Sequence, residues 1–225
     1  RGLDPKRQDT AGDKPENFWE KAELETFFSY LAPAQEPEKY TRFRVLAFGG
    51  LRRGECLALT WNDIDFTAGT IRVNKTLTQG VKGHQIVQAP KTKKGRRTVP
   101  MDPATMAALK RWRLRQMQKY MALGINTNQP DQLVFATRFN THKYLNQPEK
   151  WLKQIEDAHN TQHRITVHGF RHSHASALFA AGATIKEVQE RLGHEDVQTT
   201  LNVYTHVTKN QNQEAVEKLT AYLGF

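Results

Sequence analysis

The sequence has a single cysteine, Cys56, among its 225 residues. One thiol forms no internal disulfide and no thiolate metal cluster, which excludes the disulfide-stapled and zinc-ribbon classes. No apolar run approaches the roughly 20 residues of a membrane-spanning helix, and the N-terminus lacks the pattern of a signal peptide. These absences favour a protein of a reducing cytoplasm that has no membrane partner.

Positive charge is what the sequence has in excess. Lysine and arginine total 33 against 23 acidic residues, for a formal net charge of +10. An excess of this size favours a polyanionic partner, most often a nucleic acid. Charge alone does not separate DNA from RNA or from an anionic membrane, and a basic but indifferent surface is the simpler alternative.

The spacing of apolar residues predicts a mostly helical chain of the α+β class. Residues 1–17 are polar and contain Pro5, Gly12 and Pro15, which is typical of a linker. The chain begins at Arg1 rather than at methionine, so we expect it to be a part of a longer protein. Helical periodicity predicts helices over residues 20–31, 38–49, 51–59, 104–123, 146–159, 169–181, 185–192 and 197–206. Alternation predicts a small three-stranded antiparallel sheet formed by residues 70–77, 85–89 and 97–100.

Two of these helices have clear predicted core faces. In the first, Leu24, Phe27, Phe28 and Leu31 form one stripe. In the helix that begins after Asp102, we expect Met106, Leu109 and Met117 to face the core.

A basic turn separates the second and third predicted strands. Its sequence is Pro90-Lys91-Thr92-Lys93-Lys94-Gly95-Arg96-Arg97. A basic turn is usually no more than a solvated surface. Together with the charge of the whole chain, it favours contact with phosphate.

The stretch from Val167 to His206 contains a guanidinium, several imidazoles and a phenol. Arg171 lies in the first turn of an otherwise small and apolar helix, where a buried charge needs a salt bridge or a bound anion. Histidines 168, 172 and 174 could suggest zinc, but neither a suitably placed glutamate nor a thiolate completes such a site. We therefore expect structural or hydrogen-bonding roles for His172 and His174. A tyrosine hydroxyl such as that of Tyr204 can serve as a covalent nucleophile.

Five short motifs occur in one order along the chain. They are Gly50-Leu51-Arg52-x-x-Glu55, Pro90-Lys91-Thr92, His168-x-x-Arg171-His172, Leu192-Gly193-His194 and Tyr204-Thr205-His206. This series resembles the catalytic domain of the tyrosine recombinases, the phage-integrase family, and most of all the integrases of temperate phages and conjugative transposons. The resemblance covers about residues 18–207 and leaves residues 208–225 as an amphipathic C-terminal segment.

The resemblance implies a role for each matched residue. Tyr204 is the expected nucleophile, which attacks the scissile DNA phosphate and becomes linked to the 3′ phosphate. The other expected catalytic residues are Arg52 and Arg171 on the non-bridging oxygens, His194 donating to the same phosphate, His168 accepting the tyrosine proton, and Lys91 protonating the departing 5′ oxygen. Glu55 is expected to orient Arg52, and further DNA contacts are expected from Lys93, Lys94, Arg96 and Arg97. No metal or other cofactor is implied.

The resemblance also implies what the protein acts on and with. We expect site-specific cleavage and rejoining of double-stranded DNA at attachment sites, which integrates or excises a mobile element in a bacterial cell. The expected assembly is a tetramer on DNA, with accessory DNA-bending proteins possible. The C-terminal segment is predicted to dock on a neighbouring protomer or to pack on its own domain. The alternatives are a catalytically silent DNA-binding relative and a DNA-relaxing enzyme of the type IB topoisomerase kind.

Overall fold

The computed structural model describes residues 17–80, 83–90, 95–129 and 131–193, together with residues 201, 204–205, 220 and 223–224. Residues 1–16 of the predicted linker and nearly all of the C-terminal segment lie outside these ranges, so the predictions made for them stand untested. Within the described part of the chain, none of the helices has the length and apolarity needed to cross a membrane.

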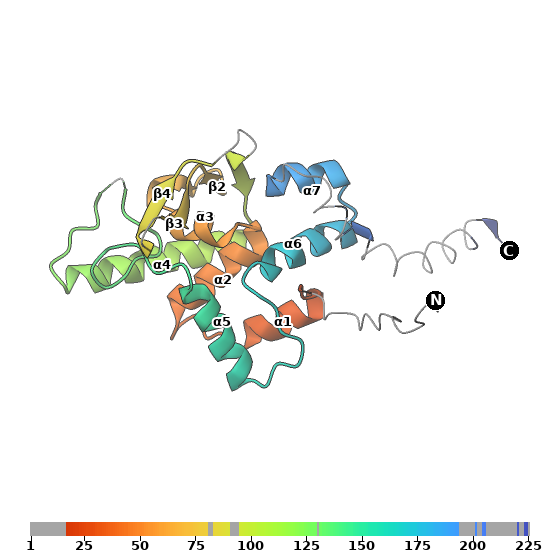
Figure 1. Cartoon of the computed structure of the whole chain (residues 1–225), viewed down its shortest axis with the longest axis horizontal. Helices are drawn as coiled ribbons and strands as arrows, with labels where there is room; N and C mark the ends of the chain where they lie inside the picture. The colour runs from red at the N-terminus through yellow and green to blue at the C-terminus, as the bar shows by residue number, and fades with distance from the viewer. Residues whose placement is uncertain are drawn as a thin grey trace, which may run out of the picture.

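The helices follow the sequence prediction closely. They are α1 (Lys21–Ser29), α2 (Pro37–Gly49), α3 (Arg53–Ala58), α4 (Pro103–Met121), α5 (Gln147–Ala158), α6 (Gly169–Ala180) and α7 (Ile185–Leu192). Figure 1 shows α2 near the centre, with the strands and α3 above it, α1 and α5 below it, and α6 and α7 on the right. Leu201, Tyr204 and Thr205 are helical, and the rest of the predicted helix 197–206 lies outside the described residues.

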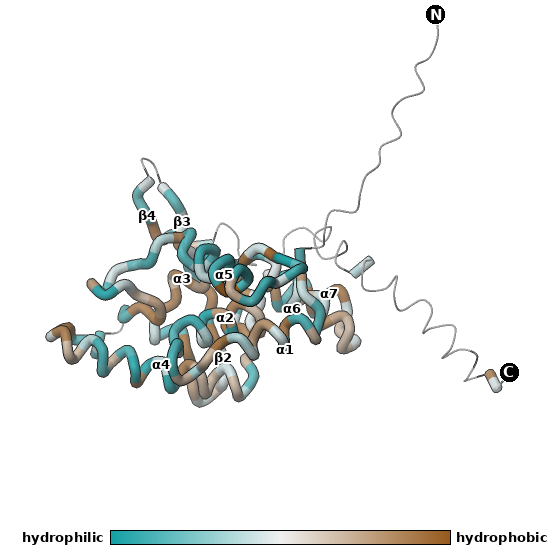
Figure 2. The backbone as a smooth tube through the Cα atoms, turned by 90° about the horizontal axis from the view of Figure 1, so that it is seen from below, coloured by the Kyte–Doolittle hydropathy of each residue, from teal (hydrophilic) through white to brown (hydrophobic). Residues whose placement is uncertain are grey.

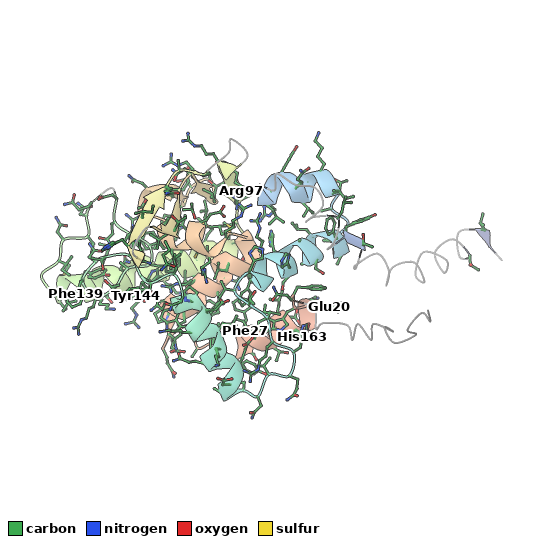
Figure 3. The ribbon with its side chains drawn as sticks, in the orientation of Figure 1. Glu20, Phe27, Arg97, Phe139, Tyr144 and His163 are labelled. Atoms are coloured by element: carbon green, nitrogen blue, oxygen red, sulfur yellow. The ribbon has the colours of Figure 1, made fainter. Side chains whose placement is uncertain are left out.

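An aromatic cluster joins α1, α2 and α6. The ring of Phe27 lies 5.2 Å from that of Phe43 and 5.3 Å from that of Phe170. Trp19 closes the cluster with its ring 5.0 Å from Phe27, whose place in the lower half of the molecule is marked in Figure 3. Aromatic pairs in tilted or edge-on contact bury much apolar area and fix the angles between elements. This cluster therefore sets the position of α6, which carries Arg171.

The predicted stripe on α1 is confirmed, whereas the predicted stripe on α4 is wrong at one position. Met117 is 41% exposed and its neighbour Gln116 is 1% exposed. The Gln116 amide can be buried because both its oxygen and its nitrogen form hydrogen bonds. It accepts from the indole nitrogen of Trp61 and donates to the carbonyl of Leu133. Burying an amide whose hydrogen bonds are satisfied costs little folding free energy. The spacing of apolar residues alone does not reveal such a buried polar residue.

In the part of the chain that the structure describes, the strands form two sheets rather than one. β1 (Ile64–Asp65), β2 (Thr70–Val73) and β5 (Arg97–Pro100) form an antiparallel three-stranded sheet in the order β1-β2-β5, and β3 (Thr76–Gln79) pairs with β4 (Gln85–Gln88) in a separate ribbon. The class and the number of strands in the larger sheet were predicted correctly. Its membership was not, because residues 85–89 pair with β3 and the third strand is Ile64–Asp65. Figure 2 shows the β3–β4 ribbon projecting from the body of the protein.

The break within the predicted strand 70–77 has a local cause. The side chains of Asn74 and Lys75 both turn toward the buried carboxylate of Asp63, and β3 then packs against α3. The approach is so close that a Cβ on Gly54 would lie 2.4 Å from the carbonyl oxygen of Leu77. One consequence concerns the basic segment. Residues 91–94 lie outside the described residues, but the strands on either side of this segment belong to different sheets, since β4 pairs with β3 and β5 pairs with β2.

Candidate active site

Several of the predicted site residues meet at the C-terminal end of α7. The last carbonyl groups of a helix lack partners within it and carry partial negative charge. Three arginines donate to three successive carbonyl oxygens there: Arg97 Nε to Arg191 at 3.0 Å, Arg171 Nη2 to Leu192 at 2.6 Å, and Arg52 Nη2 to Gly193 at 3.3 Å. Guanidinium groups from β5, α6 and the start of α3 are thereby gathered around one helix end.

Arg171 is the most deeply buried of the three, with 1% of the residue exposed. Its second nitrogen, Nη1, donates to the carbonyl of Gly50 at 2.7 Å. Burial, and then the charge of Arg52, lowers the pKa of Arg171 to about 9. Arg171 is still protonated at neutral pH, but its surroundings disfavour the charge, so an anion bound beside it would be stabilised.

Gly50 is needed where α2 meets α7. It ends α2 in the left-handed conformation with φ 61°. A Cβ at this position would lie 2.6 Å from Cδ2 of Leu192 and 2.7 Å from Cδ2 of His174. The absence of a side chain therefore lets the end of α2 approach the end of α7 and brings the Gly50 carbonyl within reach of Arg171.

Arg52 lies just before α3 as its N-cap residue, where the backbone is still extended. Its Nη1 donates to Oε1 of Glu55 at 2.9 Å and its backbone N–H donates to Oε2 of the same carboxylate at 2.8 Å. The predicted orienting contact of Glu55 on Arg52 is thus confirmed. The side chain of Arg52 is 41% exposed and that of Glu55 only 4%, so the arginine opens toward solvent from a buried anchor.

Arg97 has a largely buried side chain, whereas the DNA contact predicted for it requires an exposed one. Its side chain is 7% exposed and donates through Nη2 and Nη1 to both oxygens of Glu55, at 2.8 Å and 3.1 Å. Burial acts to raise the pKa of Glu55, but the hydrogen bonds and charges of Arg97 and Arg52 hold it below its usual value. Strand alternation is the sequence signal that could have found this, because Arg97 shares a face with the fully buried Val99. Arg96, which precedes β5, is exposed, and the DNA contact predicted for it stays a prediction.

His168 lies at the start of α6 beside a cleft of about 490 Å³ that Arg52 and Arg53 also line. Burial, followed by the charges of His172, Arg171 and Arg52, lowers the pKa of His168 to about 4. The imidazole is therefore neutral at pH 7 and able to accept a proton. His172 contacts it ring to ring, with centroids 4.7 Å apart.

This lowered pKa predicts how cleavage depends on pH. The second-order rate constant of the free enzyme should stay constant as the pH falls from 7 to about 5, and should decline only near the pKa of His168, where the imidazole gains a proton and can no longer act as a base. The NMR titration of the His168 ring in the DNA-free chain, assigned with a His168→Asn variant, checks the same value. A midpoint near the ordinary histidine value of about 6.5 would contradict it.

His174 has the hydrogen-bonding role predicted from the sequence. Its Nε2 accepts from Nε of Arg191 at 2.9 Å, so Nδ1 carries the proton and donates to the carbonyl of Ala47 at 2.9 Å. Burial and the charge of Arg191 lower its pKa to about 3. His174 therefore stays neutral and ties α6 to both α2 and α7.

Of the remaining predicted site residues, Tyr204 lies within the described residues and the others do not. The ring of Tyr204 packs edge-on against Phe179 of α6, with centroids 5.1 Å apart, in a cluster that includes Val188 and Leu192 of α7. Lys91, Lys93, Lys94 and His194 lie outside the described residues. In the part of the chain that the structure describes, no group of three histidine, cysteine, aspartate or glutamate side chains is arranged to hold a metal ion.

A mostly helical domain with small antiparallel sheets is the catalytic fold of the tyrosine recombinases, and the described part of this chain has that fold. The sequence matches the Phage integrase family over residues 17–211, and the chain belongs to that family. The chain is 35% identical over 214 residues to the "Tyrosine recombinase XerC-like" protein of Caldanaerobacter subterraneus subsp. tengcongensis. It is 34% identical over 206 residues to the ICEBs1 integrase of Bacillus subtilis.

These matches cover 88% and 92% of the chain but only 54% and 55% of the two relatives, so the chain spans about half of their length. Among solved structures, the Tn1549 transposon integrase in complex with circular intermediate DNA superposes with a TM-score of 0.73 at 23% identity. That match covers 92% of this chain and 68% of the other. At this level of identity the likeness shows the fold.

Proposed function

We propose that this chain is the catalytic part of a site-specific DNA recombinase, which cleaves and rejoins strands through a 3′-phosphotyrosyl intermediate. The observation that carries the proposal is the convergence of Arg52 and Arg171, from two different elements, on the end of α7. Neutral His168 lies in a cleft that Arg52 also lines. Two planar guanidinium groups suit the non-bridging oxygens of a phosphodiester better than point charges do.

The proposed reaction is an exchange of one ester bond for another. The hydroxyl oxygen of Tyr204 attacks the scissile phosphorus while His168 accepts its proton, and the new bond between phosphorus and the tyrosine oxygen replaces the bond to the 5′ oxygen. Lys91 gives a proton to the departing 5′ oxygen. Arg52, Arg171 and His194 stabilise the charge that develops on the non-bridging oxygens. Attack by a 5′ hydroxyl then reverses these steps and reseals the strand without an external energy source.

The proposed substrate is duplex DNA at the attachment sites of a mobile element, and the proposed active assembly is a homotetramer on that DNA. Relatives at 26% to 34% identity named as the ICEBs1 integrase, the integrase of Staphylococcus phage L54a and the transposase of Tn916 support a role in element movement. Lys93, Lys94 and Arg96 are proposed as contacts to phosphates that flank the cleavage site. In this scheme the C-terminal segment docks between protomers.

Trapping a covalent adduct tests the proposed function. The chain is incubated with a nicked suicide duplex that carries an end of its own element, and the product is run on a denaturing gel. We expect a protein–DNA adduct that forms only on the duplex with the element's end. Binding without any adduct would indicate a silent relative, and relaxation of supercoiled plasmid without site preference would indicate a topoisomerase-like enzyme.

The proposal also predicts strongly salt-dependent binding. The net charge of +10 supplies the attraction, and each neutralised phosphate should contribute about −0.9 to the slope of log affinity against log salt concentration. Fluorescence anisotropy of a labelled duplex at several potassium chloride concentrations gives this slope. A slope near zero would show that the basic excess plays no part in DNA binding.

A further inference from the structure

β5 and the end of α7 hold each other by reciprocal hydrogen bonds. The side chain of Arg97 on β5 donates to the backbone carbonyl of Arg191 at 3.0 Å, and the side chain of Arg191 donates to the carbonyl of Pro100 at 2.9 Å. Figure 3 shows Arg97 on its strand next to the end of α7. This strand begins at Arg97, the last residue of the basic sequence that starts at Pro90, and only Gly193 separates the end of α7 from His194.

Glu55 lies between two guanidinium groups within this junction. Arg97 occupies both of its oxygens through two-pronged contact, while Arg52 reaches Oε1 through Nη1 alone at 2.9 Å. The side chains of Arg97 and Glu55 are 7% and 4% exposed. The Glu55 carboxylate and the guanidinium groups of Arg52 and Arg97 together carry a net charge of +1. Arg52 is the one of the three that faces solvent.

We propose that Arg97 is a positioning residue for Arg52, acting through Glu55, and that it does not touch DNA. By occupying the carboxylate, Arg97 stops Glu55 from closing a two-pronged pair with Arg52 and neutralising it. Arg52 then keeps both its orientation and a net positive charge for the scissile phosphate. This inference rests on the proposed cleavage of DNA, and it replaces the surface contact that the basic sequence around Arg97 predicted.

A neutral phosphate analogue separates this role from a purely structural one. A methylphosphonate at the scissile position removes the negative charge on one non-bridging oxygen, so cleavage of it should depend less on Arg52. We expect Arg97→Met to slow adduct formation on the ordinary duplex by about tenfold to a hundredfold, as small misplacements of a catalytic group do. On the methylphosphonate duplex its rate relative to wild type should recover, as it should for Arg52→Ala.

Arg72→Met is the matched control. Arg72 lies on β2 in the same sheet, opposite Thr98, and its guanidinium likewise approaches a buried carboxylate, that of Asp63, at 3.5 Å. Its removal changes the charge of the chain by the same amount, and we expect wild-type cleavage on both duplexes. The salt dependence of binding provides a second readout, since a lost phosphate contact would reduce the slope by about 0.9. We expect Arg97→Met to leave the slope unchanged.

The outcomes separate the possibilities. Wild-type cleavage by Arg97→Met, an equal loss on both duplexes, or a reduced salt slope would each overturn the positioning role while leaving the proposed function intact. Absence of any adduct with the wild-type chain would overturn the proposed function and this inference with it. If Arg97→Met does not fold, Arg97→Lys takes its place, because it keeps the charge near Glu55 but has no planar fork. Its expected loss on the ordinary duplex is about tenfold, recovered on the methylphosphonate, and an equal loss on both would again overturn the role.

Discussion

Replacing Tyr204 by phenylalanine is expected to abolish the covalent protein–DNA adduct and to leave DNA affinity nearly unchanged. The substitution removes only the hydroxyl oxygen, which in the proposed reaction forms the new bond to phosphorus. The aromatic ring, which packs against Phe179 at 5.1 Å in the cluster between α6 and α7, stays in place. Loss of a nucleophile removes the covalent route entirely, so the adduct should fall by about a thousandfold or more.

The suicide duplex measures the adduct, and anisotropy at fixed salt measures the affinity. Tyr144→Phe is the matched control, because Tyr144 is 76% exposed and the same atom is deleted there. It should form adduct at the wild-type rate. An undiminished adduct with Tyr204→Phe would mean that another tyrosine is the nucleophile, with Tyr222 the first to examine.

The sequence predicted the site best where two charged residues stand one helical turn apart or where a charge lies within an apolar helix. Arg52 and Glu55 are three residues apart in the first turn of a helix, and this spacing brings their side chains together in the structure as predicted. Arg171 was recognised as a charge too costly to bury without compensation, and it is indeed buried. Its compensation includes two carbonyl groups at helix ends, and no pattern in the sequence pairs residue 171 with residues 50 and 192.

Interactions between distant segments account for what the sequence did not predict. The pairing of β5 with β2 rather than β4 depends on the break at Asn74 and Lys75, which is set by their contacts with Asp63. The inward position of Arg97 follows from that pairing, because alternation along β5 gives Arg97 the buried face of Val99. The basic sequence around Arg97 therefore did not reveal that this one side chain points inward and pairs with Glu55.

Arg171→Lys is expected to reduce adduct formation by about a hundredfold to a thousandfold, although the positive charge is kept. The Arg171 guanidinium spans two helix ends, donating at 2.7 Å to Gly50 and at 2.6 Å to Leu192. A lysine ammonium is a compact point charge and lacks the rigid planar fork that bridges these two carbonyls and that the proposed reaction uses on the phosphate. Removal of one donor to a developing oxyanion typically costs this much in rate.

The same substitution should lower the free energy of unfolding by about 1–3 kcal/mol, because it leaves a buried carbonyl without its donor. Urea unfolding measures this loss, and adduct formation is compared at a temperature where both proteins are folded. Arg164→Lys is the control, since Arg164 pairs with Asp157 at the surface at 2.5 Å and its side chain is 47% exposed. It should be wild-type in both assays, because exposed ion pairs contribute little. Wild-type cleavage by Arg171→Lys would show that charge alone suffices at this position and that the fork spanning α2 and α7 has no part in catalysis.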